Sequence, residues 1–326
     1  MNQHLNECKG KSILITGGAG FIGSHLVDRL SLENKVIILD NLSSGSLVNL
    51  ERSKNRITFI KGDILNKGLL KDIVAEVEVE IIFHLAANTS ILKSISDSCN
   101  DMSVNIEGTL NLLEACVESN IERLIYSSSG AIFGEAKRLP IDEEHHLNPE
   151  SPYAVSKLAA EKYCFAFHKI HGIPVTALRY FNVYGPRQGN SEYASVASTF
   201  LSRIKDDKPL TIFGDGKQTR DFVFIEDIVK ANMLVASHPA AVGEIFNIAT
   251  GKGTSIDLLA TIIKQINEQA NPIVYHTAPV AGEIRHSQAD INKARKLLGY
   301  NPQTSLKEGL LLTWKEMINN RKSLNA

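Results

Sequence analysis

The segment TGGAGFIG, residues 16–23, constrains the fold of this chain more than any other feature. It follows a short apolar run, opens a stretch with helical spacing, and contains the pattern G-x-x-G-x-x-G at Gly17, Gly20 and Gly23. Small residues let the backbone turn tightly and approach a pyrophosphate, whose charge then meets the helix N-terminus. A tight strand-to-helix turn without a ligand is the alternative interpretation. The elements that follow favour a dinucleotide site.

Short apolar runs alternate with helical patterns through the first half of the chain. The runs cover 12–16, 35–40, 57–60, 81–86, 123–127 and 175–179, and the helical stretches include 21–30, 105–117 and 153–170. Strands that are apolar throughout and separated by helices are typical of a parallel sheet covered on both faces. Right-handed crossovers then give an α/β fold with a doubly wound parallel sheet, the Rossmann architecture.

The pattern loosens after about residue 181, where Gly, Pro and Asn interrupt the sequence and the later elements are shorter. We therefore predict a dinucleotide-binding domain over 1–181. A smaller C-terminal α/β domain for the substrate follows over 182–326, with some of its segments returning to the first domain.

Composition excludes several classes of function. The chain has 326 residues and a formal net charge of −1, so no overall field draws it to nucleic acid or to an anionic membrane. No apolar run approaches the roughly 20 residues that span a bilayer, and the N-terminus lacks the apolar core of a signal peptide. The four cysteines are far apart and form no CxxC pair, so no metal site is expected. We expect a cytoplasmic protein.

Two acidic residues extend the predicted cofactor site. Asp40 ends the second apolar run, about 20 residues beyond the glycines, where a carboxylate accepts hydrogen bonds from ribose hydroxyls and repels a 2′-phosphate. This favours NAD over NADP. A turn-forming role ahead of Asn41 is the alternative for Asp40, and the two roles are compatible. Asp63 follows the third run, where a loop reaches the adenine.

Tyr153 and Lys157 form the pattern Y-x-x-x-K, which places both side chains on one face of a helix. A phenol is a weak base at neutral pH, but a nearby ammonium, helped by an oxidised nicotinamide, stabilises the phenolate and lowers its pKa. The preceding strand ends in Ser127, Ser128 and Ser129, at the sheet edge where open α/β sheets bind ligands. A polar loop is the alternative for these serines, and a serine that faces a substrate hydroxyl is the sharper hypothesis.

The motifs TGGAGFIG, HLAA, SSSGAIFG, YAVSK and RYFNVYGPRQ occur in this order. The chain thereby resembles the extended short-chain dehydrogenase/reductase family over nearly its whole length, and within it the NAD-dependent nucleotide-sugar epimerases and dehydratases. The resemblance implies that Ser129, Tyr153 and Lys157 are catalytic. It assigns further cofactor contacts, besides the three glycines and the two acidic residues, to Phe21, Ile22, Asn41, Ile64, Leu85, Ala86, Ala87, Tyr153 and Lys157.

The same resemblance implies a substrate site. Asn182 and Arg220 match residues that contact the substrate diphosphate, Arg285 offers a second cation, and Ser129 faces the sugar. Ser287 falls on the position where a bulky tyrosine excludes N-acetyl sugars from strict UDP-galactose epimerases. The serine leaves room for a 2-acetamido group.

Gly130 and Ala131, directly after Ser129, indicate which reaction is expected. Dehydratases of the family carry Asp-Glu at these positions, and UDP-glucuronate decarboxylases carry a Glu there. Glycine and alanine cannot transfer protons, so dehydration and decarboxylation lose support. The remaining reaction of the family is epimerisation at C4 through a 4-keto sugar.

We expect a UDP-sugar 4-epimerase that acts on UDP-glucose, UDP-N-acetylglucosamine or both. Within the family the chain is most similar to the UDP-glucose and UDP-N-acetylglucosamine 4-epimerases. A UDP-glucuronate, GDP-sugar or CDP-sugar epimerase, a plain dehydrogenase and a non-catalytic NAD-binding regulator are the alternatives. Helices over 105–117 and 153–170 carry more apolar residues than the sheet needs, and family members commonly pair these helices. A homodimer is therefore expected.

Overall fold

The computed structural model describes residues 8–188, 195–267, 272–279 and 284–324. Its strands are β1 (Ser12–Thr16), β2 (Lys35–Asp40), β3 (Ile57–Lys61), β4 (Ile81–His84), β5 (Arg123–Ser129), β6 (Val175–Tyr180), β7 (Asn182–Tyr184), β8 (Leu210–Phe213), β9 (Thr219–Arg220), β10 (Phe222–Phe224), β11 (Ile245–Ile248), β12 (Thr254–Ser255) and β13 (Val274–Thr277).

The helices are α1 (Phe21–Leu30), α2 (Lys67–Glu76), α3 (Ile91–Ser96), α4 (Ser98–Met102), α5 (Gly108–Cys116), α6 (Pro152–His171), α7 (Val196–Lys205), α8 (Ile225–Ser237), α9 (Ile256–Lys264), α10 (Asn292–Leu298) and α11 (Leu306–Leu324). A π-helical turn, η4 (Ser103–Glu107), joins α4 to α5. Short 3-10 turns are η2 (Leu47–Leu50), η3 (Lys54–Arg56), η5 (Gly130–Phe133) and η6 (Pro239–Ala241).

A seven-stranded sheet forms the centre of the molecule, in the order β11-β6-β5-β4-β1-β2-β3. All its pairs are parallel. Strand order reverses between β1 and β4, which is the switch point where such sheets bind ligands at their carboxyl ends. The predicted doubly wound α/β fold is confirmed. The six apolar runs of the first half are β1 to β6.

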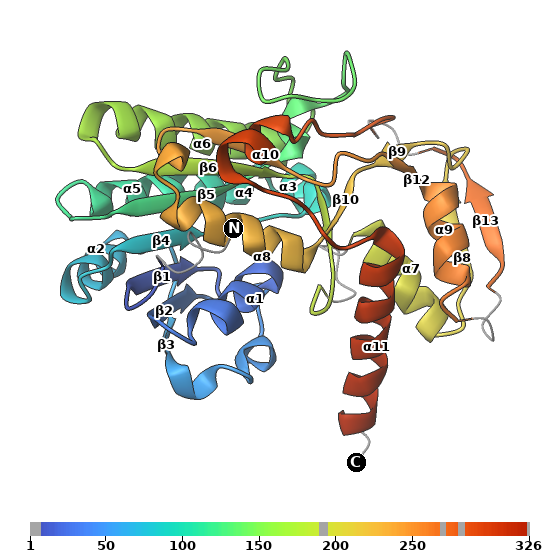
Figure 1. The fold of residues 1–326 in the computed structure, drawn as a ribbon, viewed down its shortest axis with the longest axis horizontal. Helices are drawn as coiled ribbons and strands as arrows, with labels where there is room; N and C mark the ends of the chain where they lie inside the picture. The colour runs from blue at the N-terminus through green and yellow to red at the C-terminus, as the bar shows by residue number, and fades with distance from the viewer. Residues whose placement is uncertain (1–7, 189–194, 268–271, 280–283, 325–326) are drawn as a thin grey trace.

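Side chains of each strand alternate between two apolar cores, one on each face of the sheet. Ile13 and Ile15 of β1 belong to the core that also contains Leu26 of α1 and Ile228 of α8, whereas Leu14 between them belongs to the opposite core. That opposite core includes residues of α2, α5 and α6. Both faces are thus covered, as Figure 1 shows. Burial on both faces explains why these strands are apolar throughout.

The second half of the chain contributes to two places. β11 adds the last strand to the central sheet beside β6, and α8 packs on α1. These two segments after residue 181 thus pack with elements of the first half of the chain. The elements β8, β9, β12, β13, α7 and α9 gather on the right of Figure 1. Among the described residues, every helix is too short or too polar to cross a membrane.

Candidate active site

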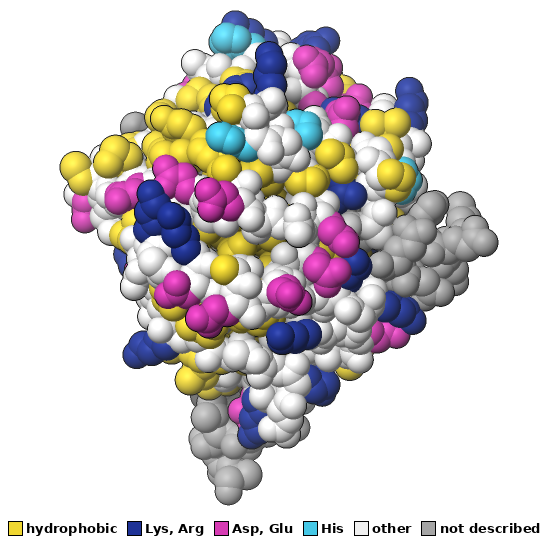
Figure 2. Space-filling view, turned by 90° about the vertical axis from the view of Figure 1, so that its left-hand side faces the viewer, with side chains coloured by type: hydrophobic (Ala, Val, Ile, Leu, Met, Phe, Trp, Pro, Cys, Tyr) yellow, Lys and Arg dark blue, Asp and Glu magenta, His cyan; other side chains and the backbone are white. Residues whose placement is uncertain are grey.

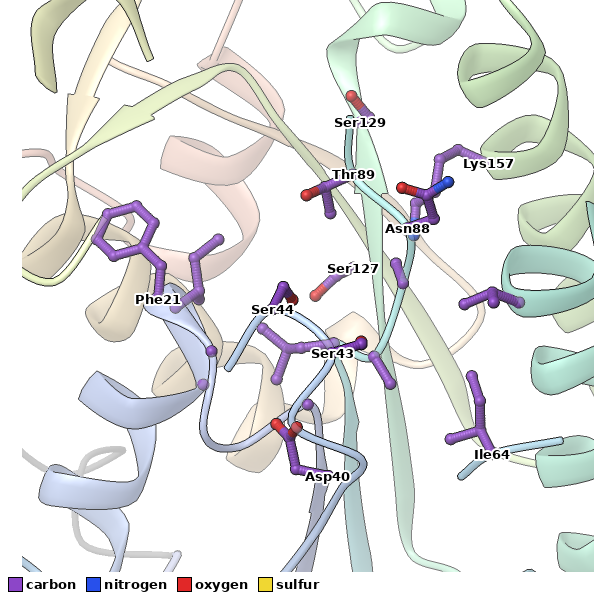
Figure 3. Close-up of a pocket in the computed structure, with 18 of the residues that line it drawn as sticks. Phe21, Asp40, Ser43, Ser44, Ile64, Asn88, Thr89, Ser127, Ser129 and Lys157 are labelled. Carbon is purple, nitrogen blue, oxygen red and sulfur yellow. The ribbon is translucent and has the colours of Figure 1, made fainter. Parts of the chain in front are cut away.

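A cavity of about 610 Å³ runs along the carboxyl edge of the sheet at the switch point. All the predicted cofactor residues line it: Gly17, Gly20, Phe21, Ile22, Gly23, Asp40, Asn41, Asp63, Ile64, Leu85, Ala86, Ala87, Tyr153 and Lys157. Ser129 and Asn182 line it as well. Figure 3 shows its length, with Asp40 at one end and Ser129 at the other.

The glycine loop brings bare backbone to the wall of this cavity. Gly17 has a φ of +71°, and a Cβ there would lie 2.7 Å from the backbone nitrogen of Ala86. A Cβ at Gly23 would lie 2.2 Å from the carbonyl oxygen of Gly17. Gly20 caps α1 without a side-chain hydrogen bond. The first amides of α1 therefore face the cavity without a side-chain acceptor of their own, which suits a pyrophosphate.

Asp40 combines the two roles that its position allows. One carboxylate oxygen accepts the Leu42 amide at 2.8 Å and forms the turn, and the other accepts the Ala19 amide at 2.9 Å. The second bond fixes the glycine loop to the end of β2. Because each oxygen keeps a free lone-pair direction, Asp40 can still accept a ribose hydroxyl.

The loops after β2 and β3 meet at the predicted adenine end. Asn41 donates to one carboxylate oxygen of Asp63 at 2.7 Å, and the Leu65 amide donates to the other at 2.9 Å. These bonds hold the loop after β3, which carries Ile64, against the cavity.

Ser129, Tyr153 and Lys157 come together at the other end. Ser151 caps α6 by accepting the Ala154 amide, which places Tyr153 in the first turn of the helix and Lys157 one turn later. Ser129 ends β5 and hydrogen-bonds the Tyr153 phenol. The ammonium of Lys157 lies over the Tyr126 ring, 4.4 Å from its centre, in a cation–π contact.

Burial controls the proton affinities at this end of the cavity. It raises the pKa of the Tyr153 phenol more than the Ser129 hydrogen bond lowers it, and it lowers the pKa of Lys157 to about 8. We expected Lys157 to lower the Tyr153 pKa, but in the protein without cofactor this pKa lies above its usual value. Desolvation of the phenol outweighs the favourable contacts.

Arg220, Arg285 and Ser287 form a separate group that does not belong to the cavity lining. Arg220 lies in β9, whose Thr219 carbonyl accepts the Ser287 amide at 3.1 Å. The guanidinium of Arg285 donates two hydrogen bonds to Asp215, at 2.6 and 2.8 Å, and holds the pKa of that carboxyl below its usual range. The structure thus brings the three residues together around Thr219 of β9, outside the cavity lining.

The cavity also contains residues that the sequence did not single out. Asn88 and Thr89 follow the HLAA motif after β4, and both line the same cavity as Ser129 (Figure 3). The Asn105 amide fixes the Asn88 backbone through bonds of 2.8 and 3.0 Å. Phe181, in the RYFN motif, lies against Gly130. The position of Asn88 and Thr89 directly after a buried strand was the available signal.

The chain matches the family model described as "NAD dependent epimerase/dehydratase family" over residues 13–249. A putative UDP-glucose 4-epimerase of Methanocaldococcus jannaschii is 40% identical over 95% of this chain and 100% of its own.

Two solved structures resemble the model over almost their whole length. A UDP-glucose 4-epimerase of Thermotoga maritima, solved with UDP-glucose, has a TM-score of 0.90 and 39% identity over 96% of this chain and 99% of its own. A UDP-N-acetylglucosamine 4-epimerase of Methanobrevibacter ruminantium, in complex with UDP-N-acetylmuramic acid, has a TM-score of 0.90 and 38% identity with the same coverage.

Proposed function

This chain belongs to the NAD-dependent epimerase/dehydratase family, and on that premise we propose that it inverts C4 of a UDP-sugar through a 4-keto intermediate. The observation that carries the proposal is the single cavity surface on which the glycine loop and Asp40 lie at one end and Ser129, Tyr153 and Lys157 at the other. That arrangement suits a dinucleotide laid along the sheet edge with its reactive ring beside Tyr153.

Each member of the trio has a distinct role in the proposed reaction. Tyr153 takes the proton of the sugar 4-hydroxyl and returns it, and Ser129 hydrogen-bonds the same oxygen. Lys157 supplies a positive charge that favours the phenolate and binds the cofactor ribose. NAD, when bound, supplies the reversible hydride acceptor and, in its oxidised form, a further positive charge near the phenol.

The residues after Ser129 support epimerisation over elimination. Gly130 and Ala131 carry no acid or base. In addition, a Cβ at Gly130 would lie 3.3 Å from three atoms of the Phe181 ring. A side chain at position 130 therefore requires Phe181 to give by a few tenths of an ångström, which supports epimerisation over dehydration here.

For the substrate, we propose UDP-glucose and UDP-N-acetylglucosamine, with the diphosphate bound by Asn182, Arg220 and Arg285. Relatives of both specificities resemble the chain to the same degree. In this proposal Arg285 exchanges Asp215 for the diphosphate, and Ser287 leaves space for the 2-acetamido group. We also propose a homodimer through the face that carries α6. The cytoplasmic location and the domain division at residue 181 stay predictions.

The decisive experiment is to incubate the purified protein with UDP-glucose, UDP-N-acetylglucosamine, UDP-glucuronate and a GDP-sugar, and to follow C4 inversion by proton NMR. We expect inversion of one or both of the first two without net consumption of added NAD. Absence of turnover with both UDP-glucose and UDP-N-acetylglucosamine would refute the proposed substrate class. Stoichiometric reduction of added NAD would instead identify a dehydrogenase.

A further inference from the structure

A buried polar network reaches α6 between Tyr153 and Lys157, at Ser156. Its centre is Asp101 of α4, which is 1% exposed. One carboxylate oxygen accepts the Ser156 hydroxyl at 2.6 Å, and the other accepts the Asn105 amide at 3.2 Å. Ser156 lies on α6 directly before Lys157. The carboxylate is therefore bonded to the segment of α6 that carries the proposed catalytic side chains.

The network continues to the cavity wall. The Asn105 side chain donates a hydrogen bond to the backbone carbonyl of Asn88 and accepts one from the backbone N–H of the same residue. Asn105 lies in the π-helical turn η4, where the widened backbone interrupts the regular helical ladder. Asn88 lines the cavity beside Lys157, as Figure 3 shows. Asp101 thus connects two walls of the site through Asn105 and Ser156.

The charge of Asp101 is not cancelled by its hydrogen-bond partners, because both are neutral. Another buried carboxylate near Lys157, that of Glu161, differs in this respect. It forms two hydrogen bonds with the guanidinium of Arg179, at 2.7 and 3.1 Å. Glu161 raises the pKa of Lys157 more than Asp101 does, but Asp101 is the one of the two whose hydrogen-bond partners carry no positive charge. A buried charge with neutral partners is stabilised by a nearby ion of opposite sign.

We propose that Asp101 is a positioning residue that keeps Lys157 charged at the active site and ties the segment of α6 directly before Lys157 to the cavity wall. The inference rests on the proposed function, since it assigns a task to Lys157 and Tyr153. The same charge disfavours the Tyr153 phenolate, so Asp101 acts on both groups at once.

Other ionisable groups also surround this pair. Lys157 faces Glu161 and Cys164 on its own helix, His84 on β4 and Tyr126 on β5. Lys93 and Asp97 lie on α3 or its end, where Asp97 is exposed and caps α4. The thiol and the phenol are kept neutral by burial, and His84, with a pKa of about 3, is neutral as well. Asp101 and Glu161 are then the buried anions near Lys157 in the described part of the chain.

Asp101→Asn tests the charge with little change to the hydrogen bonds. An asparagine oxygen accepts from Asn105, its amide donates to Ser156, and the Ser156 hydroxyl turns to the Tyr153 carbonyl, already 3.0 Å away. Without the carboxylate, the pKa values of Lys157 and Tyr153 both fall. We expect both limbs of the pH–kcat profile to move to lower pH by about one unit.

The matched control is Asp97→Asn, which removes an exposed carboxylate near α4 and keeps a residue that caps helices equally well. Its profile should coincide with that of the wild type. A second readout does not need the substrate: the phenolate absorbance of Tyr153, taken as the difference from a Tyr153→Phe background, should titrate at lower pH in Asp101→Asn.

The inference would be overturned if Asp101→Asn lost activity equally at every pH, while both limbs of its pH–kcat profile and the titration of the Tyr153 phenolate stayed at the wild-type pH. Asp101 would then have only a structural role. Asp101→Ser provides the same comparison if the asparagine variant does not fold. Absence of turnover in the wild type would reject the proposed reaction, whereas the phenolate titration would still decide the effect of Asp101.

Discussion

At the scale of single residues, Lys157 shows how a catalytic site opposes stability. The residue is 4% exposed, and burial lowers its pKa from 10.5 to about 8. Below about pH 8 the folded protein holds a charged lysine that water would solvate better. Between that pH and 10.5 the unfolded chain binds more protons than the folded one, so the contribution of Lys157 to stability rises with pH across this window.

We therefore predict that Lys157→Met stabilises the protein without cofactor at neutral pH, by up to about 3 kcal/mol, while activity is lost. The gain should shrink as the pH rises above 8 and vanish above 10.5, where lysine is neutral in both states. Urea unfolding of the wild type and of Lys157→Met, from neutral pH to above pH 10.5, measures this difference in stability. A gain that does not depend on pH would show that packing, not charge, is responsible.

Tyr153 gives a second prediction at this scale. Tyr153→Phe removes the proposed acid–base group and should lower kcat by about 10²–10⁴-fold. The glycine loop and Asp40 are untouched by this change, so the variant should still bind NAD. Tyr163→Phe, on the exposed side of the same helix, is the control. Full activity of the Tyr153 variant in a competent assay would remove Tyr153 from the mechanism.

At the scale of elements, a buried ion pair joins α6 to β6 and β5. The Glu161 carboxylate of α6 accepts two hydrogen bonds from Arg179 of β6 and one of 2.6 Å from Ser128 of β5. Arg179 also lies 5.0 Å from the centre of the Phe133 ring. This contact sets the position of the helix that carries Tyr153 relative to the strand that ends in Ser129.

Glu161→Gln leaves the Arg179 guanidinium buried without its anion. We expect a loss of about 3–5 kcal/mol in the free energy of unfolding, because removing one partner of a buried pair leaves an uncompensated charge. Chemical denaturation measures the loss. Glu118→Gln, an exposed substitution of the same type at the end of α5, should change stability little. Equal stabilities of the two variants would contradict the prediction.

At the scale of the whole molecule, apolar side chains remain exposed on neighbouring helices. They include Leu92 and Ile95 of α3, Met102 of α4, and Val155 and Tyr163 of α6, with exposures from 42 to 68%. Figure 2, which views the end of the molecule where α5 and α6 point left in Figure 1, shows yellow side chains gathered in its upper half. The apolar face was expected on 105–117 and 153–170, and the structure places it on α3, α4 and α6.

The proposed homodimer predicts the effect of a charge on this face. Tyr163→Glu should raise the dimer dissociation constant about a hundredfold or more, because a two-fold axis brings the new charge close to its copy in a dry interface. Val48→Glu introduces the same charge at a side chain that is 81% exposed on η2, away from this face. Sedimentation equilibrium should give a monomer for the first and a dimer for the second. Identical sedimentation of both variants would move the interface elsewhere.

The sequence by itself determined the sheet and the cofactor end of the site. Strand and loop motifs act locally: a buried strand, three glycines and a following helix produce the phosphate-binding turn wherever they occur together, and Asp40 stands at a fixed distance from them. Tyr153 and Lys157 share one helix face for the same local reason. These predictions needed no knowledge of which segments meet in space.

Tertiary structure decided the rest, because it depends on contacts between residues far apart in the chain. Only packing bonds Asp101 to Ser156, brings Phe181 against Gly130 and collects Arg220, Arg285 and Ser287 outside the cavity lining. Burial, with the charge of Asp101 as a smaller cause, sets the Tyr153 pKa above its usual value, where the spacing to Lys157 had suggested the reverse. Spacing along a helix fixes which groups are neighbours, but the free energy of their charges depends on how much water the whole fold excludes.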